Sequence, residues 1–304
     1  MKIIDDTLRI PQLESGDKIY HYTTAEGLKG LCINGFWITE RSFLNDSMEF
    51  QVATEVLEEV LDENMNNSSA CKVLKKEIRK EVDRLQTPGI LTTDEVAYTG
   101  EYILSFCLDY DSPLMWSSYS DFTGYCIGFD FDKLFSSFDA PERILHGQVI
   151  YDRAEQIKLI TDLIQKEYFD SSSYPHLNSW RDLDNLSGEE LADFVNFLSV
   201  EISAYNMFFK LPVFEGEHEY RMIFSPIHDG GRVKESEYVK QHFRIKDEVL
   251  IPYIEIKLSS IESIEKVMVG SKNKSDIAAK GVRCFFRNLK HDIIVEQSSI
   301  PLRY

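Results

Sequence analysis

The sequence predicts an α+β fold, in which one mixed or antiparallel sheet carries two helical insertions. Strand-like segments occur near both ends and in the middle of the 304-residue chain. Two helical blocks, at about 46–86 and 153–209, separate these segments instead of alternating with single strands. This segregation is typical of α+β folds rather than of doubly wound parallel sheets. We expect a single domain over residues 1–304, because a chain of this length can bury one large core.

The first predicted strand is KIYHYT, residues 18–23. A short helix follows in TAEGLKGLCING, with Thr24 as its N-cap and Gly35 as its C-cap. FWITE, residues 36–40, is the next short strand. His21 therefore lies near the end of a strand, just ahead of a hydroxyl pair and a helical turn, which is a favourable place for a ligand contact.

The first helical block begins at Asp46 and contains two helices, the second of which follows Ser69. Apolar residues at helical spacing mark the first of them. These stripe residues are Met48, Val52, Val56 and Val60. The second block covers 153–169 and 187–209, and SGEE at 187–190 fits the S-x-x-E pattern of a capping box.

Short segments that are rich in aromatic and β-branched residues, and bounded by turn residues, are predicted as the remaining strands. They are 101–109, 124–131, 146–152, 218–226, 249–258 and 264–270. A helix from about Ser275 to Leu289 precedes the last strand, 292–297.

Composition narrows the range of partners. The formal net charge of −18 repels phosphate backbones, so we expect no broad nucleic-acid surface. Five scattered cysteines without a C-x-x-C pair indicate a reducing compartment. The start of the chain lacks a signal-peptide apolar run, and no segment approaches the ~20 apolar residues of a membrane span. A cytoplasmic protein without membrane contact is therefore expected.

Several familiar catalytic motifs are absent from the sequence. It contains no G-x-x-x-x-G-K-[ST] phosphate loop, no G-x-G-x-x-G after a strand and no G-x-S-x-G nucleophile elbow. The helical zinc motif H-E-x-x-H is also missing. The sequence thus favours neither a P-loop nucleotide hydrolase nor a nucleophile-elbow hydrolase, and we predict no metal site.

Polar residues interrupt an otherwise apolar strand in EGEHEYRMIF, residues 215–224. Because side chains alternate along a strand, Glu217, Glu219 and Arg221 are predicted to share one face. Two carboxylates and a guanidinium are costly to bury without partners. They form either a solvent-facing ladder of ion pairs or a site in which Arg221 orients a functional carboxylate.

A second unusual segment is SPLMWSSYSDFTG, residues 112–124. Trp116 and Tyr119 are one helical turn apart, with hydroxyl side chains between them. Two interpretations stay open for these rings. They are either an aromatic plug over the core or a stacking wall for a ligand that carries a ring.

Six pieces of the chain, taken together, resemble the bacterial family of unknown function numbered 2971. They are YHYTTAEGLKGL, FWITERSFLNDSMEF, LSFCLDYDSPLMWSSYSDFTGYCIGFD, VIYD, FFKLPVFEGEHEYRMIF and the C-terminal VMVGSK with SIPLR. The resemblance spans nearly the whole chain in the family's order. Its Leu-Asn-Asp, Met-Trp-x-x-Tyr and Glu-x-Glu-Tyr-Arg motifs are the most specific parts.

The opening of the chain is also similar to the start of ADP-ribosyltransferase folds of the DNA-modifying toxin and RNA 2'-phosphotransferase kind. In such folds a first-strand histidine binds the ribose of NAD, and an aromatic residue stacks on nicotinamide. The resemblance implies that His21 is the ribose contact, with Tyr22 and Thr23 also in the cofactor-binding set. It further implies that Tyr119 or Trp116 stacks on the nicotinamide ring.

The same resemblance implies roles for three charged residues. Glu219 would be the catalytic carboxylate that stabilises the cation-like transition state, and Glu217 a second acid that orients the acceptor. Arg221 would contact a phosphate. Nicotinamide leaves NAD as a neutral molecule, so little acid catalysis is needed. The reaction does need a negative group fixed near the developing ribosyl cation, within dry walls.

We therefore predict an NAD-using ADP-ribosyltransferase-like enzyme or NAD glycohydrolase, of the kind that acts as a bacterial toxin or phage-defence effector. NAD is its expected substrate, and a protein target or regulatory partner is expected as well. One alternative is a non-catalytic module that binds a nucleotide or a partner protein, in which Glu219 and Arg221 pair structurally. Another is a metal-dependent nuclease that uses Asp46, Glu49 and Glu217.

Overall fold

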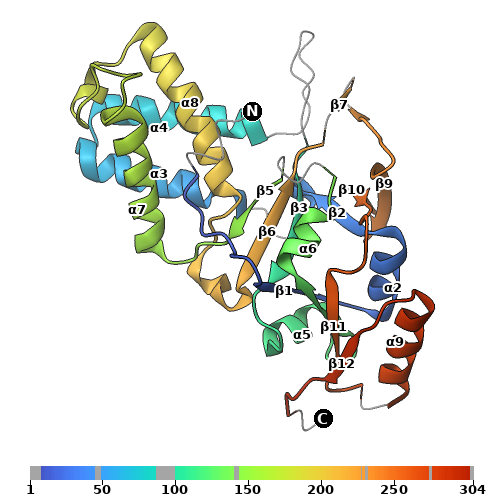
Figure 1. Cartoon of the computed structure of the whole chain (residues 1–304). Coiled ribbons are helices and arrows are strands. Elements are labelled where there is room, and N and C mark those ends of the chain that lie inside the picture. The colour runs from blue at the N-terminus through green and yellow to red at the C-terminus, as the bar shows by residue number, and fades with distance from the viewer. Residues whose placement is uncertain are drawn as a thin grey trace. The chain divides into compact units, whose positions relative to one another are not determined.

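The computed structural model describes residues 8–44, 49–86, 100–139, 144–226, 228–229, 232–273 and 276–301. The chain divides into two compact units (Figure 1). The first, called the helical unit, contains Met1–Pro11, Asn45–Ile90 and Val149–Glu215, and the second, the sheet unit, contains Gln12–Leu44, Leu91–Gln148 and Gly216–Tyr304. Both predicted helical insertions fall in the helical unit. All the residues predicted to bind or act on NAD fall in the sheet unit.

A mostly antiparallel sheet forms the centre of the sheet unit, which confirms the predicted α+β class with a mixed or antiparallel sheet. Its strands are β1 (Lys18–Thr23), β2 (Phe36–Glu40), β3 (Tyr102–Cys107), β4 (Tyr125–Asp130), β5 (Leu145–Gln148), β6 (Glu219–Phe224), β9 (Val239–Lys246), β10 (Val249–Ile256), β11 (Ile264–Val269) and β12 (Ile294–Gln297). Within the described residues the order is β12-β11-β4-β1-β3-β2-β10-β9, while β6 pairs with β3 and with β5. β11 and β12 pair in parallel. Two further strands, β7 (His228–Asp229) and β8 (Arg232–Val233), form a separate small pair.

β3 is the central strand, because it pairs with three others. β6 runs along the whole of one edge, from Tyr102↔Phe224 to Cys107↔Glu219. The opposite edge is shared between two strands. β2 pairs with it at Tyr102 and Ile103, whereas β1 meets it at Cys107. β1 and β2 therefore approach opposite ends of one edge of β3 and diverge along its middle.

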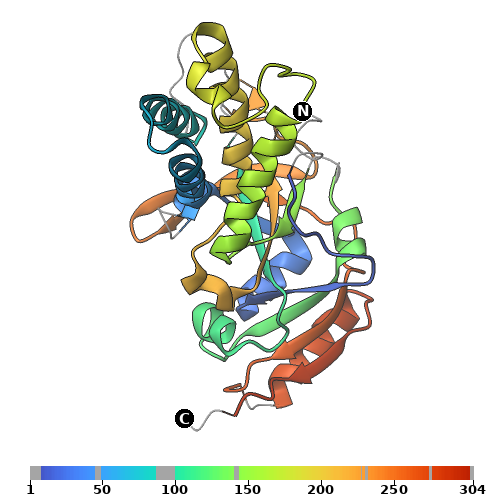
Figure 2. The same cartoon turned by 90° about the vertical axis from the view of Figure 1, so that its left-hand side faces the viewer.

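Short helices join the strands of this unit. They are α2 (Ala25–Asn34), α5 (Pro113–Ser120), α6 (Phe131–Ser136) and α9 (Asp276–Asn288), the last of which lies beside β11 and β12 (red in Figure 2). Both predicted caps of α2 are confirmed: Thr24 Oγ1 accepts from the N–H of Gly27, and Gly35 ends the helix with a φ of 99°. A Cβ atom on Gly35 would lie 2.1 Å from the carbonyl oxygen of Ile256, so glycine also allows close contact with β10.

Side-chain alternation sorts the apolar residues of the sheet into two clusters. The larger cluster lies on the face to which Ile19 and His21 point, which we call the His21 face. It includes Phe36, Phe106, Phe129, Tyr220, Phe224 and Ile254. The smaller cluster lies on the opposite face, called the Tyr22 face. It consists of Tyr22, Cys107, Met115, Trp116, Cys126 and Met268.

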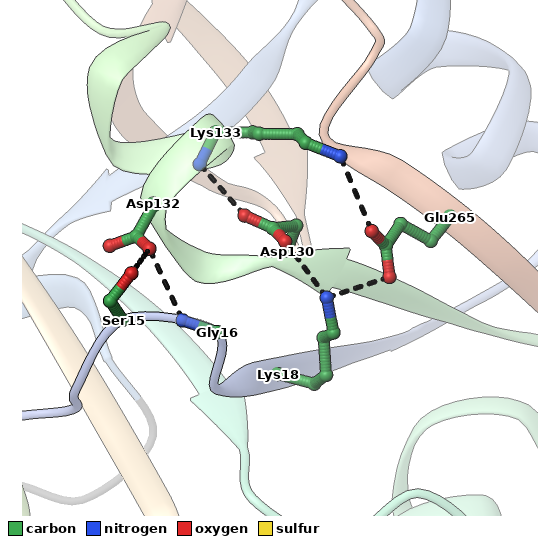
Figure 3. Close-up of polar contacts among 7 residues, drawn as sticks. All are labelled: Ser15, Gly16, Lys18, Asp130, Asp132, Lys133 and Glu265. Atoms are coloured by element: carbon green, nitrogen blue, oxygen red, sulfur yellow. Dashed lines mark hydrogen bonds and ion pairs between the residues drawn. The ribbon is translucent and has the colours of Figure 1, made fainter.

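Ionic contacts join the start of β1 to the end of β4 and the start of β11 (Figure 3). Lys18 Nζ lies 2.8 Å from a carboxylate oxygen of Asp130 and of Glu265. Asp130 also accepts a hydrogen bond from the N–H of Lys133, and thereby caps α6. The hydrogen bond from Lys18 holds the pKa of Glu265 below its usual value. Because these groups are partly exposed, each ion pair contributes only about 0–1 kcal/mol, and the network mainly aligns three chain segments.

The longer helices of the described helical unit are labelled in Figure 1. They are α3 (Val52–Met65), α4 (Ser69–Gln86), α7 (Arg153–Ile164), which continues as a π-helical turn over Gln165–Phe169, and α8 (Gly188–Asn206). α4 packs against α8, and α3 packs against α7 and α8. The predicted stripe residues Val52, Val56 and Val60 are buried. Across the described residues, none of the helices has both the length and the apolar character needed to cross a bilayer.

Asn206, at the end of α8, caps the start of α3 from a distant part of the sequence. Its Oδ1 accepts hydrogen bonds from the N–H groups of Ala53 at 2.8 Å and Thr54 at 3.3 Å. Its Nδ2 donates to Thr54 Oγ1 at 3.0 Å. The first N–H groups of a helix have no acceptor within the helix, and Gln51 supplies no side-chain cap. Asn206 therefore performs the task of a local N-cap.

Three details differ from the sequence predictions. The helix expected from Asp46 is α-helical from Val52, after a 3₁₀ turn at Glu49–Gln51, and Asp46 itself lies outside the described residues. The capping box at 187–190 is wrong, because the Ser187 side chain makes no capping hydrogen bond. β9 is missing from the predicted strands, because its mostly exposed residues lack an apolar run. The remaining 3₁₀ turns are η1 (Arg41–Phe43), η5 (Asp182–Asn185) and η6 (Pro212–Glu217).

Glu201 of α8 should make the stability of the helical unit depend on pH. Burial raises the pKa of Glu201 to about 7, although its carboxylate accepts a hydrogen bond from Tyr168 Oη at 2.8 Å. The pKa of a glutamate in an unfolded chain is about 4.3. An acid whose pKa is raised by folding destabilises the fold when it ionises, so stability should fall as pH rises from about 4 to about 7.

We expect Glu201→Gln to raise Tm by several degrees at pH 8 and to change it little at pH 4, as measured by thermal unfolding. Glu189→Gln, at an exposed position of the same helix, is the matched control and should change Tm by the same small amount at both pH values. Equal shifts of Tm for Glu201→Gln at both pH values would contradict the prediction.

Candidate functional site

A buried ion pair lies within β6. Arg221 Nε donates to Glu219 Oε1 at 2.8 Å, and Arg221 Nη2 donates to Glu219 Oε2 at 2.9 Å. The exposed fractions of the two side chains are 8% for Glu219 and 1% for Arg221. Two parallel N–H···O bonds are the strongest arrangement of guanidinium and carboxylate. The predicted alternative of a solvent-facing ladder is therefore wrong, and the protein's own guanidinium orients the Glu219 carboxylate.

Glu217 is not part of this strand. It ends the 3₁₀ turn η6, and β6 begins at Glu219. Between them His218 has a φ of +40°, in the left-handed region that non-glycine residues rarely adopt. His218 Nδ1 lies 2.8 Å from Asp109 Oδ2 at the surface. The prediction that Glu217 and Glu219 share a strand face is wrong, because strand alternation starts only after this turn.

Trp116 and Tyr22 form the centre of the Tyr22 face. Their rings meet edge to face, with centroids 5.0 Å apart. Tyr22 Oη donates to the carbonyl of Asp109 at 2.8 Å and accepts from the N–H of Ser112 at 2.9 Å. Trp116 Nε1 donates to Asp111 Oδ1 at 2.7 Å. Since Trp116 is 0% exposed, its ring presents no face to a ligand in this conformation.

Asp111 joins the Tyr22 face to the end of the described chain. Besides the bond from Trp116, its carboxylate accepts hydrogen bonds from Ser298 Oγ at 2.7 Å and from the N–H of Ser299 at 3.0 Å. Sequence reasoning misses this residue, because Ser298 and Ser299 are almost 190 positions away. The contacts make Asp111 a structural anchor for α5.

The thiol of Cys107 faces the same region, since Cys107 lies opposite Glu219 in the β3–β6 pair. Burial and, to a smaller extent, the nearby carboxylates of Asp109, Glu219 and Glu217 raise the pKa of Cys107 to about 12, although a hydrogen bond from the N–H of Asp109 opposes this shift. A nucleophilic cysteine needs a lowered pKa. Cys107 is therefore a protonated core residue at neutral pH rather than a nucleophile.

His21 lies on the opposite face of the sheet. Its ring centroid is 5.9 Å from those of Phe36 and Phe106, and its Nδ1 is 3.4 Å from the carbonyl oxygen of Ser105. The imidazole thus fills the space where β1 and β2 diverge along β3. Burial lowers the pKa of His21, which favours the neutral ring. The sheet separates this ring from Trp116 and from the side chain of Glu219.

The two remaining predicted ligand contacts lie at the ends of secondary-structure elements. Tyr119 is on α5, one turn beyond Trp116, and is 53% exposed, so its ring is accessible. Thr23 ends β1 and packs closely over the start of α2, where a Cβ on Gly27 would lie 1.9 Å from Thr23 Oγ1. The structure therefore brings Tyr22 together with Trp116 and Glu219 with Arg221, but it leaves His21 and Thr23 on the other side of the sheet.

A cavity of about 250 Å³ lies in the sheet unit beside the end of β6 and the strand β10. Its apolar floor belongs to the core cluster of the His21 face and comprises Ile144, Phe224, Val239, Ile254 and Ile256. Its polar rim comprises Asp139, Ser225, Lys234, Glu235 and Ser236, and Pro226 completes the lining. The residues predicted to bind NAD are not among these lining residues. The cavity could have been predicted from one sequence feature, the end of an apolar strand at Ser225 and Pro226.

The structure describes no metal centre. Within the described residues, no three His, Cys, Asp or Glu side chains gather in a group that could hold a metal ion. The nuclease alternative requires Asp46 and the side chain of Glu49, which lie outside the described part of the chain. Glu217, its third member, lies in η6.

Residues 115–222 match the model of a family described as a protein of unknown function, DUF2971. The match covers a little over one third of the chain and confirms the resemblance to this family over that segment. It includes Trp116, Tyr119 and the Glu219–Arg221 pair. No curated protein and no solved structure matches the chain significantly. The similarity to ADP-ribosyltransferases stays a prediction from the sequence.

Removing one partner of the buried pair should destabilise the protein much more than removing both. We expect Arg221→Met to lower the free energy of unfolding by about 3–5 kcal/mol, because it leaves the Glu219 carboxylate buried without its guanidinium. The double variant Glu219→Met/Arg221→Met should recover a large part of this loss.

Urea unfolding of Glu219→Met, Arg221→Met and the double variant measures this coupling. Lys272→Met removes the exposed pair with Asp121 and is the control, with an expected loss below about 1 kcal/mol. Additive losses in the double variant would show that the two side chains are not coupled.

Proposed function

We propose that the chain is a non-catalytic module whose sheet unit binds a small molecule, rather than an NAD-consuming transferase. The bidentate pairing of buried Glu219 with Arg221 carries this proposal. In ribosyl transfer the catalytic carboxylate must face the positive charge that develops on the substrate. Here both carboxylate oxygens face a guanidinium of the protein. The charge of Glu219 is thus balanced before any ligand arrives. A non-catalytic module in which Glu219 and Arg221 pair structurally requires this balance.

The separation of the other candidate residues supports the same proposal. NAD could contact a ribose-binding histidine, an aromatic wall and an acid together only if all three lined one cleft. His21 packs among Phe36 and Phe106 on one face of the sheet, whereas the buried acid projects from the other face. Trp116 is already enclosed by its own contacts.

The cavity beside β10 provides the binding place of the module. Its volume of about 250 Å³ is slightly below the roughly 300–1,000 Å³ of pockets for drug-sized ligands, and therefore suits a compact molecule smaller than a dinucleotide. The floor of Phe224, Ile254 and Ile256 favours a ring or branched alkyl group. The rim carries both signs of charge, from Lys234 and Glu235, and so favours a polar end that donates and accepts hydrogen bonds.

Incubation of the purified protein with NAD distinguishes the binding module from the transferase. We expect no nicotinamide release above the buffer control, as measured by chromatography. Glu219→Gln should lower Tm, because it weakens the contact with Arg221, and should leave the NAD background unchanged. Nicotinamide release by the wild type that Glu219→Gln abolishes, while the exposed-site control Glu262→Gln retains it, would overturn the proposal in favour of the transferase.

The cavity can be tested with N-phenyl-1-naphthylamine, a neutral fluorophore in which one N–H donor joins a naphthyl group to a phenyl ring. We expect saturable binding of one probe per chain, and at least tenfold weaker binding to Ser225→Trp, whose indole should fill the rim of the cavity. Ser118→Trp places the same side chain on α5, away from the lining residues, and should bind like the wild type. Equal affinities for all three proteins, with unchanged Tm, would place the probe elsewhere and refute the cavity site.

A further inference from the structure

β9 is the last strand at one edge of the described sheet, and part of its backbone is directed away from the sheet. The N–H of Val239 bonds to Ser236 Oγ and that of Gln241 to Glu235 Oε1, neither of which belongs to β10. Main-chain groups alternate in direction along an antiparallel strand. The N–H and C=O groups of Phe243 and Ile245 therefore also point outward, beyond the stretch that residues 235 and 236 cover.

The side chains of this edge alternate between two chemical types. Phe243 and Ile245 are 62% and 74% exposed, and the paired residue Leu250 of β10 extends the same apolar patch. The other face carries the basic and titratable side chains of β9. They are Lys240, His242, Arg244 and Lys246. This strand thus has a local excess of positive charge in a chain with a net charge of −18.

We propose that the Phe243–Lys246 edge of β9 binds an acidic, extended segment of a partner protein, which adds to the sheet as a further strand. Main-chain groups of Phe243 and Ile245 pair with the added strand. Apolar side chains of that strand cover Phe243, Ile245 and Leu250 on one face. Its Asp or Glu side chains lie near Lys246 on the other face, where opposite charges on neighbouring strands attract. Arg244 adds positive charge from further inside the sheet, because its Nη2 donates to Thr39 Oγ1 of β2 at 2.9 Å. This surface is separate from the proposed function of the cavity.

The charge pattern disfavours two other occupants. A second copy of the chain, paired through its own β9, would place Lys and Arg side chains opposite one another, and like charges across strands are destabilising. A single-stranded nucleic acid would satisfy the basic side chains, but its sugar–phosphate backbone cannot continue the β ladder. It would also leave the aliphatic side chains of Ile245 and Leu250 exposed, and the strong overall negative charge of the protein repels it.

The test measures binding of a probe peptide that carries fluorescein at its N-terminus, fluorescein-Glu-Val-Glu-Ile-Glu-Val-Glu-amide, by fluorescence anisotropy. The expected result is saturable binding that weakens as salt rises from 50 to 500 mM. Ile245→Pro should weaken it at least tenfold, because it removes an N–H that points away from β10 and so spares the β9–β10 ladder. Ile245→Ala keeps this N–H and is the matched control, with an expected loss of less than threefold.

Further measurements distinguish an acidic peptide from a nucleic acid and from a second copy of the chain as the partner of this edge. Lys246→Glu should weaken binding of the acidic peptide at least tenfold, and the same peptide with Lys in place of Glu should not bind to the wild type. Thermal unfolding checks that each variant is folded. The inference is refuted if Ile245→Pro binds as tightly as Ile245→Ala, if a twelve-residue oligo-dT binds more tightly than the peptide, or if Ile245→Pro converts a dimeric wild type into a monomer in the absence of peptide.

Discussion

Side-chain alternation along the β-strands is the constraint on which the rest of this structure depends. It directs His21 and Tyr22 to opposite faces of β1. The pairings Tyr20↔Cys107 and Cys107↔Glu219 then carry the same division across β3 to β6. One face becomes the main apolar core, and the other collects an indole, a phenol and a buried ion pair. A register shift of one residue would exchange the two sets, so the chemistry of the sheet unit follows from register.

The strands and helices with continuous apolar patterns are predictable from the sequence, as β1, β4 and α2 with both of its caps show. The missed features depend on distant partners or on local backbone. Asn206 caps a helix that begins more than 150 positions earlier, and no local pattern marks it. The left-handed backbone of His218 resets the alternation that would otherwise align Glu217 with Glu219. β9 is held by its pairing with β10 and hardly by burial, so its residues resemble those of a loop.

In the candidate site, too, features set within one strand are predictable from the sequence, whereas features set by pairing between distant strands are not. Two positions on one apolar strand must share a face, so the shared face of Glu219 and Arg221 is predictable. Alternation within β1 does not predict whether Glu219 lies on the same face of the sheet as His21. Their relative orientation depends on how β1 and β6 each pair with β3. The family match covers most of α5 and the first four residues of β6, whereas most of the cavity lining and all of β9 lie beyond residue 222. The two proposed binding surfaces thus belong largely to the part of the chain outside that match.

The position of β3 between early and late segments has a consequence for synthesis on the ribosome. β1 to β4 emerge first, but the strand that covers the second edge of β3 follows about 120 positions later, after the helical segment 149–215. Pairing over such a sequence separation is slow to form. Until then the nascent chain exposes one unpaired edge of the central strand beside apolar neighbours. A product terminated before residue 219 would retain this exposed edge permanently, and should be cleared by proteolysis or accumulate as insoluble material.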